Sequence, residues 1–184
     1  MLISHKHKWI FIHVPKNAGS TTTWALSGAA DFKGASYGDL VEGPSSECGK
    51  IDFGYFQHDT ASVIREKFKE QGRDYDTYFK FGIVRNPWSR VVSKWNYWHK
   101  LVRNGSTFPH AHYVVNKFKT FDDWVLRSGT CEIQQFDYLG NSNRAQCESI
   151  KIMSAAVRQT KNWTSELEVN QVGDETLLVD VVIR

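Results

Sequence analysis

The chain has 184 residues, of which 41% are hydrophobic and 14% aromatic, and its formal net charge is +3. A chain of this length and composition builds one domain with a substantial hydrophobic core, which excludes a disordered protein. The slight positive charge suits anionic ligands but does not by itself argue for nucleic acid. The three cysteines lack the paired spacing of a zinc site, so we expect no metal, and their odd number favours a reducing compartment.

Residues 9–26, WIFIHVPKNAGSTTTWAL, predict a strand, a tight loop and a helix in succession. Such a loop leaves backbone N–H groups at the helix N-terminus pointing at one spot, and the helix dipole makes that spot favourable for an anion. Lys16 adds a full positive charge, and the run of hydroxyl residues from Ser20 to Thr23 adds donors. The segment therefore predicts a site for a phosphate-like group.

The order of residues distinguishes this loop from a Walker A loop, in which a lysine directly follows the last glycine. Here Lys16 precedes Gly19. The loop resembles the 5′-phosphosulfate loop of sulfotransferases that use 3′-phosphoadenosine 5′-phosphosulfate (PAPS), whose carbohydrate-type members read roughly HVPKTGGTS. Asn17 and Ala18 depart from the commonest letters of that pattern. The resemblance implies that the donor is held by eight loop residues: Pro15, Lys16, Asn17, Ala18, Gly19, Ser20, Thr21 and Thr22.

Residues 53–71 predict a helix that Asp59 or Thr60 caps and that Gly72 ends. His58 stands directly before this helix, and an imidazole is well suited to take a proton from a hydroxyl. In sulfotransferases of the heparan 2-O type, a histidine before a helix at this point acts as the base, which implies that role for His58. His13, beside the predicted anion loop, is the rival candidate for the base. The alternative for His58 is that it is an ordinary exposed histidine without a catalytic role.

Residues 79–100, FKFGIVRNPWSRVVSKWNYWHK, predict a strand that ends at Arg85 and a helix that Asn86 caps. The helical spacing predicts a buried stripe that includes Trp88 and Val92, and it places Ser93 on the opposite face. A guanidinium and a hydroxyl suit a phosphate monoester. The segment resembles the 3′-phosphate motif of the same family, VRDPxxRLVS, with Arg85 and Ser93 in the two binding places.

The rest of the chain is less informative. We expect a helix end and then a loop over 27–50, a polar stretch over 102–117 and a loop over 132–140. Helices are expected over 120–128 and 147–160, and a strand is expected in the final TLLVDVVIR. The order of elements favours an α/β fold with a mostly parallel sheet. The resemblance implies a single domain over 1–184 with the P-loop-like, three-layer α/β/α sulfotransferase architecture, apparently short at its C-terminus.

The resemblance implies transfer of a sulfuryl group from PAPS to a hydroxyl acceptor, which we expect to be a carbohydrate. Lys16 and His58 are then the catalytic residues, 3′-phosphoadenosine 5′-phosphate (PAP) is the product, and no metal takes part. A relative that binds PAP, another nucleotide or an anionic glycan without turnover is one alternative, and a P-loop kinase is another. Basic and aromatic residues alternate over Lys94–Arg103, as in some oligonucleotide-binding proteins, but helical burial explains the aromatic ones, so no nucleic acid partner is expected.

No signal peptide is evident in MLISHKHKW, and no apolar run approaches the ~18 residues of a membrane span. Sulfotransferases of the Golgi carry an N-terminal anchor. We therefore expect a cytoplasmic or otherwise soluble protein, and a Golgi-lumen location only if the chain was cut from a longer one.

Overall fold

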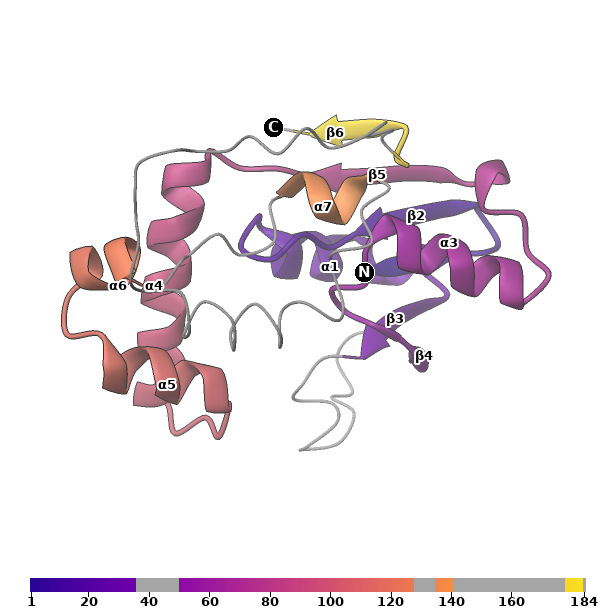
Figure 1. The fold of residues 1–184 in the computed structure, drawn as a ribbon. Helices are drawn as coiled ribbons and strands as arrows, with labels where there is room; N and C mark the ends of the chain where they lie inside the picture. The colour runs from indigo at the N-terminus through magenta and orange to yellow at the C-terminus, as the bar shows by residue number, and fades with distance from the viewer. Residues whose placement is uncertain (36–49, 128–134, 141–177, 184) are drawn as a thin grey trace. The chain divides into compact units, whose positions relative to one another are not determined.

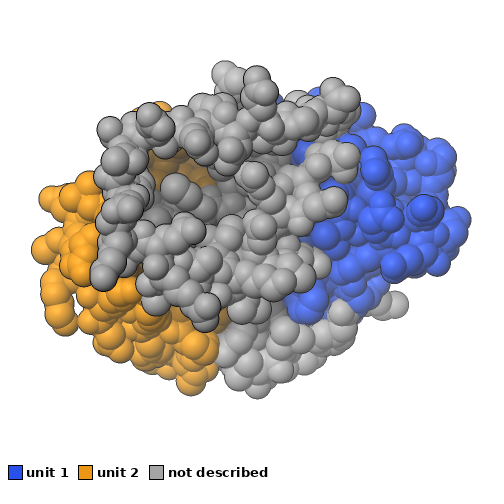
Figure 2. Space-filling model, viewed as in Figure 1, with its two compact units in different colours: residues 1–84, 133–146, 171–184 blue, residues 85–132, 147–170 orange. Residues whose placement is uncertain are grey.

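The structure is a computed structural model that describes residues 1–35, 50–127, 135–140 and 178–183. The chain divides into two compact units (Figure 2). The first unit comprises residues 1–84, 133–146 and 171–184, and the second comprises residues 85–132 and 147–170. In the described part of the chain, no helix combines the length and the apolar character that crossing a bilayer requires.

The first unit is built on a six-stranded sheet in the order β4-β3-β1-β2-β5-β6 (Figure 1). Strand β1 is antiparallel to both β2 and β3, whereas the pairs β2–β5, β5–β6 and β3–β4 are parallel. The described strands are β1 Leu2–Ser4, β2 Trp9–Ile12, β3 Phe32–Ala35, β4 Lys50–Phe56, β5 Phe79–Ile83 and β6 Val181–Ile183.

The α/β class predicted from the sequence is confirmed, and the strands at 9–12, 79–83 and 181–183 lie where they were expected. The sheet is nevertheless mixed, because residues 5–8 form a tight turn that sets β1 antiparallel to β2. Strand β1 was not predicted, and Phe32–Ala35 form β3 where a helix end and a loop were expected. The middle of the expected 27–50 loop, residues 36–49, lies outside the described residues.

Three α-helices of the first unit are described: α1 Gly19–Leu26, α3 Ala61–Glu70 and α7 Gln135–Leu139. Single 3₁₀ turns, η1 and η2, cover Ser27–Ala29 and Tyr75–Thr77. Helix α3 begins as predicted, since the Thr60 side chain accepts a hydrogen bond from the Val63 N–H at 3.4 Å. The prediction of a loop over 132–140 is wrong at Gln135–Leu139, which form α7.

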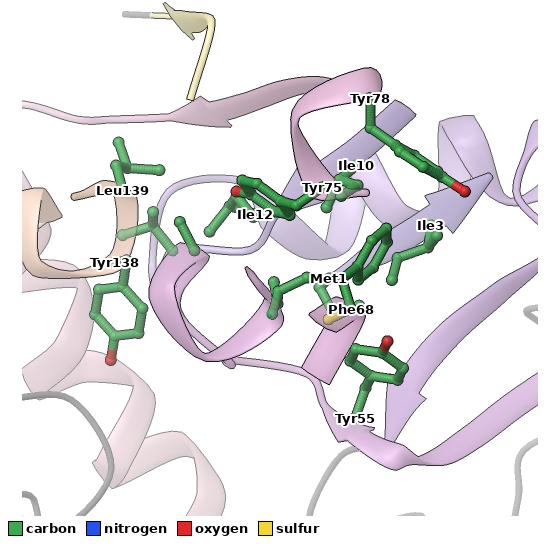
Figure 3. Close-up of a cluster of buried hydrophobic side chains, with 13 residues drawn as sticks. Met1, Ile3, Ile10, Ile12, Tyr55, Phe68, Tyr75, Tyr78, Tyr138 and Leu139 are labelled. Carbon is green, nitrogen blue, oxygen red and sulfur yellow. The ribbon is translucent and has the colours of Figure 1, made fainter. Parts of the chain in front are cut away.

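The core of this unit follows the alternation of strand residues between the two faces of the sheet. Ile10 and Ile12 on β2 lie in one buried cluster with Phe68 of α3 and Leu139 of α7 (Figure 3). Helix α7 comes so close to β5 that a Cβ on Gly82 would lie 2.3 Å from Leu139 Cδ2. The other face of β2 carries aromatic residues, and it continues past the strand into the loop that leads to α1.

The described part of the second unit consists of α4 Pro87–Arg103, α5 Pro109–Lys117 and α6 Phe121–Arg127. Asn86 caps α4 as predicted, because its Oδ1 accepts from the Ser89 N–H at 3.2 Å. The polar stretch expected over 102–117 instead contains α5. The helices share a small core of Trp98, Ala111, Val114, Phe118 and Trp124. The helix expected over 147–160 lies outside the described residues.

Candidate functional site

The loop between β2 and α1 has an unusual backbone. Lys16 and Ala18 adopt positive φ values of 67° and 59°. For residues with a Cβ, this left-handed conformation costs roughly 1–2 kcal/mol each, and such strain tends to occur at functional sites. A left-handed residue within a run of backbone N–H groups turns them toward one concavity that suits an anion.

The N-terminus of α1 follows directly. Ala18 is the N-cap residue and has no side-chain oxygen with which to cap the first turn. The N–H groups of that turn, the helix dipole and the Lys16 charge therefore favour the same kind of ligand, a phosphate-like anion. Among the hydroxyl residues, Ser20 and Thr21 are exposed, whereas Thr22 Oγ1 donates to the Ala18 carbonyl at 3.1 Å.

Asn17 holds the loop against the sheet. Its side chain is 2% exposed, and its Nδ2 donates to the Ile83 carbonyl at 2.9 Å and to Gln135 Oε1 at 2.7 Å. The loop is thereby tied to the end of β5 and to α7. Of the eight predicted loop residues, Asn17 thus uses its side-chain nitrogen to fix the loop, while its buried Oδ1 has no hydrogen-bond partner among the described residues.

His58 lies beside this loop in the same unit. Its ring is exposed, and Nδ1 is 2.9 Å from the backbone carbonyl of His13. Because a carbonyl only accepts, Nδ1 carries the proton, and the neutral ring has its lone pair on Nε2. This tautomer presents an exposed ring whose remaining nitrogen is able to accept a proton.

His13, the rival histidine, is in a different environment. It is 3% exposed, its Nδ1 faces Gln57 Nε2 at 3.2 Å, and its ring is 4.6 Å from that of His58. Burial, helped by the nearby positive charges, lowers the pKa of His13 far below its ordinary value. A buried ring of this kind does not fit the role of a base that meets an acceptor hydroxyl.

The second unit carries an open groove of about 490 Å³ along α4, lined by Arg85, Trp88, Ser89, Val92, Ser93 and Asn96. The two residues predicted to bind a phosphate, Arg85 and Ser93, therefore face the same groove. Trp88 and Asn96 also line it, which the sequence analysis missed. Trp88 and Asn96 follow Arg85 at helical spacing. This spacing is the sequence signal that could have placed them on the same face as Arg85 and Ser93.

The prediction that Trp88 and Val92 belong to the buried stripe is wrong, since they are 78% and 46% exposed. The buried face of α4 is instead centred on the side where Trp98 packs against α5 and α6. Trp88 and Val92 lie at the edge of the apolar stripe, and this edge faces the groove.

The first unit is an α/β structure in which a strained loop at the start of a helix, beside the end of a strand, has a geometry that suits a phosphate-like group. The family model described as "Sulfotransferase family" matches residues 1–165, and the chain belongs to this family. The searches of curated proteins and of solved structures return no match.

Proposed function

We propose that the protein transfers a sulfuryl group from PAPS to a hydroxyl of a carbohydrate acceptor. Family membership supports sulfuryl transfer in general, and the observation that carries the proposal is the strained loop at Lys16–Gly19 with an exposed histidine beside it. PAPS and the carbohydrate acceptor rest on the resemblance of the sequence motifs to carbohydrate sulfotransferases.

The loop from Pro15 to Thr22 would hold the 5′-phosphosulfate through its backbone N–H groups and through the Ser20 and Thr21 hydroxyls. Lys16 would stabilise the negative charge that grows on the bridging oxygen as the S–O bond breaks. Preorganised charge of this kind is often the largest single contribution to catalysis.

His58 would act as the general base. In the step, the acceptor oxygen forms a bond to sulfur and its proton passes to His58 Nε2. The bond between sulfur and the bridging oxygen of PAPS breaks, and PAP leaves with that electron pair. The hydrogen bond from Nδ1 to the His13 carbonyl supports this role, because it fixes the tautomer and orients the ring.

Arg85 and Ser93 would bind the 3′-phosphate of the nucleotide, which would distinguish PAPS from ATP. A guanidinium and a hydroxyl that line one groove are suited to a phosphate monoester. At about 490 Å³ the groove has room for more than a phosphate, and Trp88 offers an exposed aromatic surface within it.

Calorimetry with PAP, AMP and ATP plus Mg²⁺ tests this assignment. We expect PAP to bind more tightly than AMP, and Arg85→Ala to remove most of that difference, since a charge-assisted hydrogen bond contributes about 1.5–3 kcal/mol. Arg103→Ala, at the exposed C-terminal end of α4, is the matched control and should leave the difference in affinity between PAP and AMP unchanged.

Equal affinity of the wild type for PAP and AMP would contradict the assignment of Arg85 and Ser93. A Mg²⁺-dependent preference for ATP would indicate a kinase instead. Incubation with ³⁵S-labelled PAPS and a panel of desulfated glycans, tyrosine peptides and phenols tests the acceptor class. Labelling confined to peptides or phenols would contradict a carbohydrate acceptor.

A further inference from the structure

We infer that His13 is a positioning residue, whose buried ring joins the anion loop to the segment that carries His58 and so fixes the distance between donor and base. This inference rests on the proposed function for its kinetic consequences. The joint itself is defined by contacts among His13, Gly19, Gln57 and His58, all in the first unit.

The first half of the joint is the contact with Gly19. A Cβ added at Gly19 would lie 1.8 Å from Nε2 and 1.9 Å from Cδ2 of His13, far inside any tolerated contact. The imidazole therefore lies directly against the backbone at the first residue of α1. The close approach requires glycine at this position, and the ring supports the turn of the loop that presents the N–H groups of α1.

The second half is the contact with residues 57 and 58. Gln57 Nε2 is 3.2 Å from His13 Nδ1, and because an amide nitrogen only donates, Nδ1 accepts and the His13 proton is on Nε2. The backbone carbonyl of the same residue accepts from His58 Nδ1 at 2.9 Å, and the two rings meet edge to face. His13 thus orients the proposed base, His58, through its backbone carbonyl, and it holds Gln57 through its side chain.

The strand below holds His13 in place. Phe11, two residues earlier on the same face of β2, stacks on the His13 ring with centroids 5.9 Å apart. Burial is the main cause that keeps the His13 ring neutral, and the positive charge of Lys16 acts in the same direction. A neutral ring is what the joint needs, because Nδ1 must accept from Gln57.

Loss of the ring should misplace the donor and the base relative to each other. A displacement of about 1 Å between reacting groups costs on the order of 10²-fold in rate. We therefore expect His13→Ala to lower kcat by roughly 10–10²-fold and to weaken PAP binding several-fold, since the loop loses its support. The acidic limb of the kcat/KM profile against pH should stay, because His58 is still present.

The matched control is His5→Ala. His5 follows β1 and is held by Tyr78 Oη at 2.8 Å from its Nδ1, and the register of β1 on β2 places it at the opposite end of the strand pair from His13. The His5→Ala variant should lower stability. At a temperature where both His5→Ala and His13→Ala are folded, it should leave kcat and PAP affinity unchanged. If His13→Ala does not fold, His13→Gln takes its place, because an amide oxygen still accepts from Gln57.

Two readouts do not depend on activity. Nitrogen-15 NMR of the imidazoles should show the Nε2–H tautomer for His13 and the Nδ1–H tautomer for His58. Gly19→Ala should lower the melting temperature of the wild type much more than that of His13→Ala, where the added methyl group has space.

Unchanged kcat and PAP affinity in a folded His13 variant would overturn the inference. So would an acidic limb that disappears in His13→Ala and stays in His58→Ala, because His13 would then be the base. Additive melting-temperature losses for the Gly19 and His13 changes would show that the joint does not exist. If the wild type transfers no sulfuryl group, the proposed function fails, while the NMR and melting data still decide on the joint.

Discussion

At the scale of single residues, Ala18 is the clearest case of local strain, because it holds a φ of 59° that favours glycine. The related loop pattern carries glycine at this position. The alanine therefore keeps the loop geometry at a cost that the surrounding contacts, such as those of Asn17, offset.

Ala18→Gly should raise the free energy of unfolding by about 0.5–1 kcal/mol, because relief of the left-handed strain exceeds the entropy that glycine adds to the unfolded chain. Urea denaturation measures this change. Ala25→Gly, at an exposed position in the last turn of α1, is the control and should lower the free energy of unfolding instead. Two losses of equal size would contradict the argument from φ.

Under the proposed function, Lys16 is the residue whose role should differ most between the ground state and the transition state. If it stabilises charge on the bridging oxygen, Lys16→Ala should lower kcat by a larger factor than it weakens PAP binding. Steady-state kinetics together with PAP calorimetry separate the two effects, with Lys69→Ala on the exposed side of α3 as control. A normal kcat with only a raised KM would leave Lys16 a purely ground-state role.

At the scale of elements, Asn17 connects the anion loop to the end of β5 and to α7. Asn17→Ala leaves the Ile83 carbonyl and Gln135 Oε1 without this donor, and unsatisfied buried groups cost about 1–3 kcal/mol. We expect a loss of stability in that range, measured by urea denaturation, and weaker PAP binding. The exposed Asn116→Ala should change neither, and an Asn17→Ala variant as stable as the wild type would show that the link contributes nothing.

The elements that sequence reasoning found are those with local signals. Asn86 and Thr60 mark helix starts because their side chains bond to nearby N–H groups. The antiparallel placement of β1 and the formation of α7 depend on contacts with distant segments, such as Leu139 over Gly82, which no local pattern encodes. Trp88 was wrongly predicted to be buried for a related reason. The spacing of apolar residues on a helix does not show which of them lie at the exposed edge of the stripe.

The candidate site likewise has features with a local sequence signal and features without one. The loop and the histidine were found because their chemistry is carried by consecutive residues. The different roles proposed for His13 and His58 rest on their different burial, which the sequence around them does not reveal.

At the scale of the whole molecule, the buried His13 makes stability depend on pH. Its pKa is lowered in the folded state, mainly by burial, so below pH ~6.5 the unfolded chain binds a proton on this ring that the folded chain does not. This contribution to stability is complete above the ordinary histidine pKa and falls as the solution becomes more acidic.

Between pH 6 and pH 5, His13 alone should lower the free energy of unfolding by about 1 kcal/mol. The difference in urea stability between the wild type and His13→Gln at each pH isolates this contribution from those of other groups. A difference that stays constant over this range would show that the folded His13 titrates normally.

The position of β6 at the edge of the sheet also has a kinetic consequence. It pairs with β5 across about a hundred residues of sequence, whereas β1 and β2 are joined by a turn of four residues. Because loop closure over long separations is slow, the hairpin should form early and the β5–β6 pairing late in refolding. Until β6 docks, β5 presents an unpaired edge, so aggregation during refolding should begin at this strand.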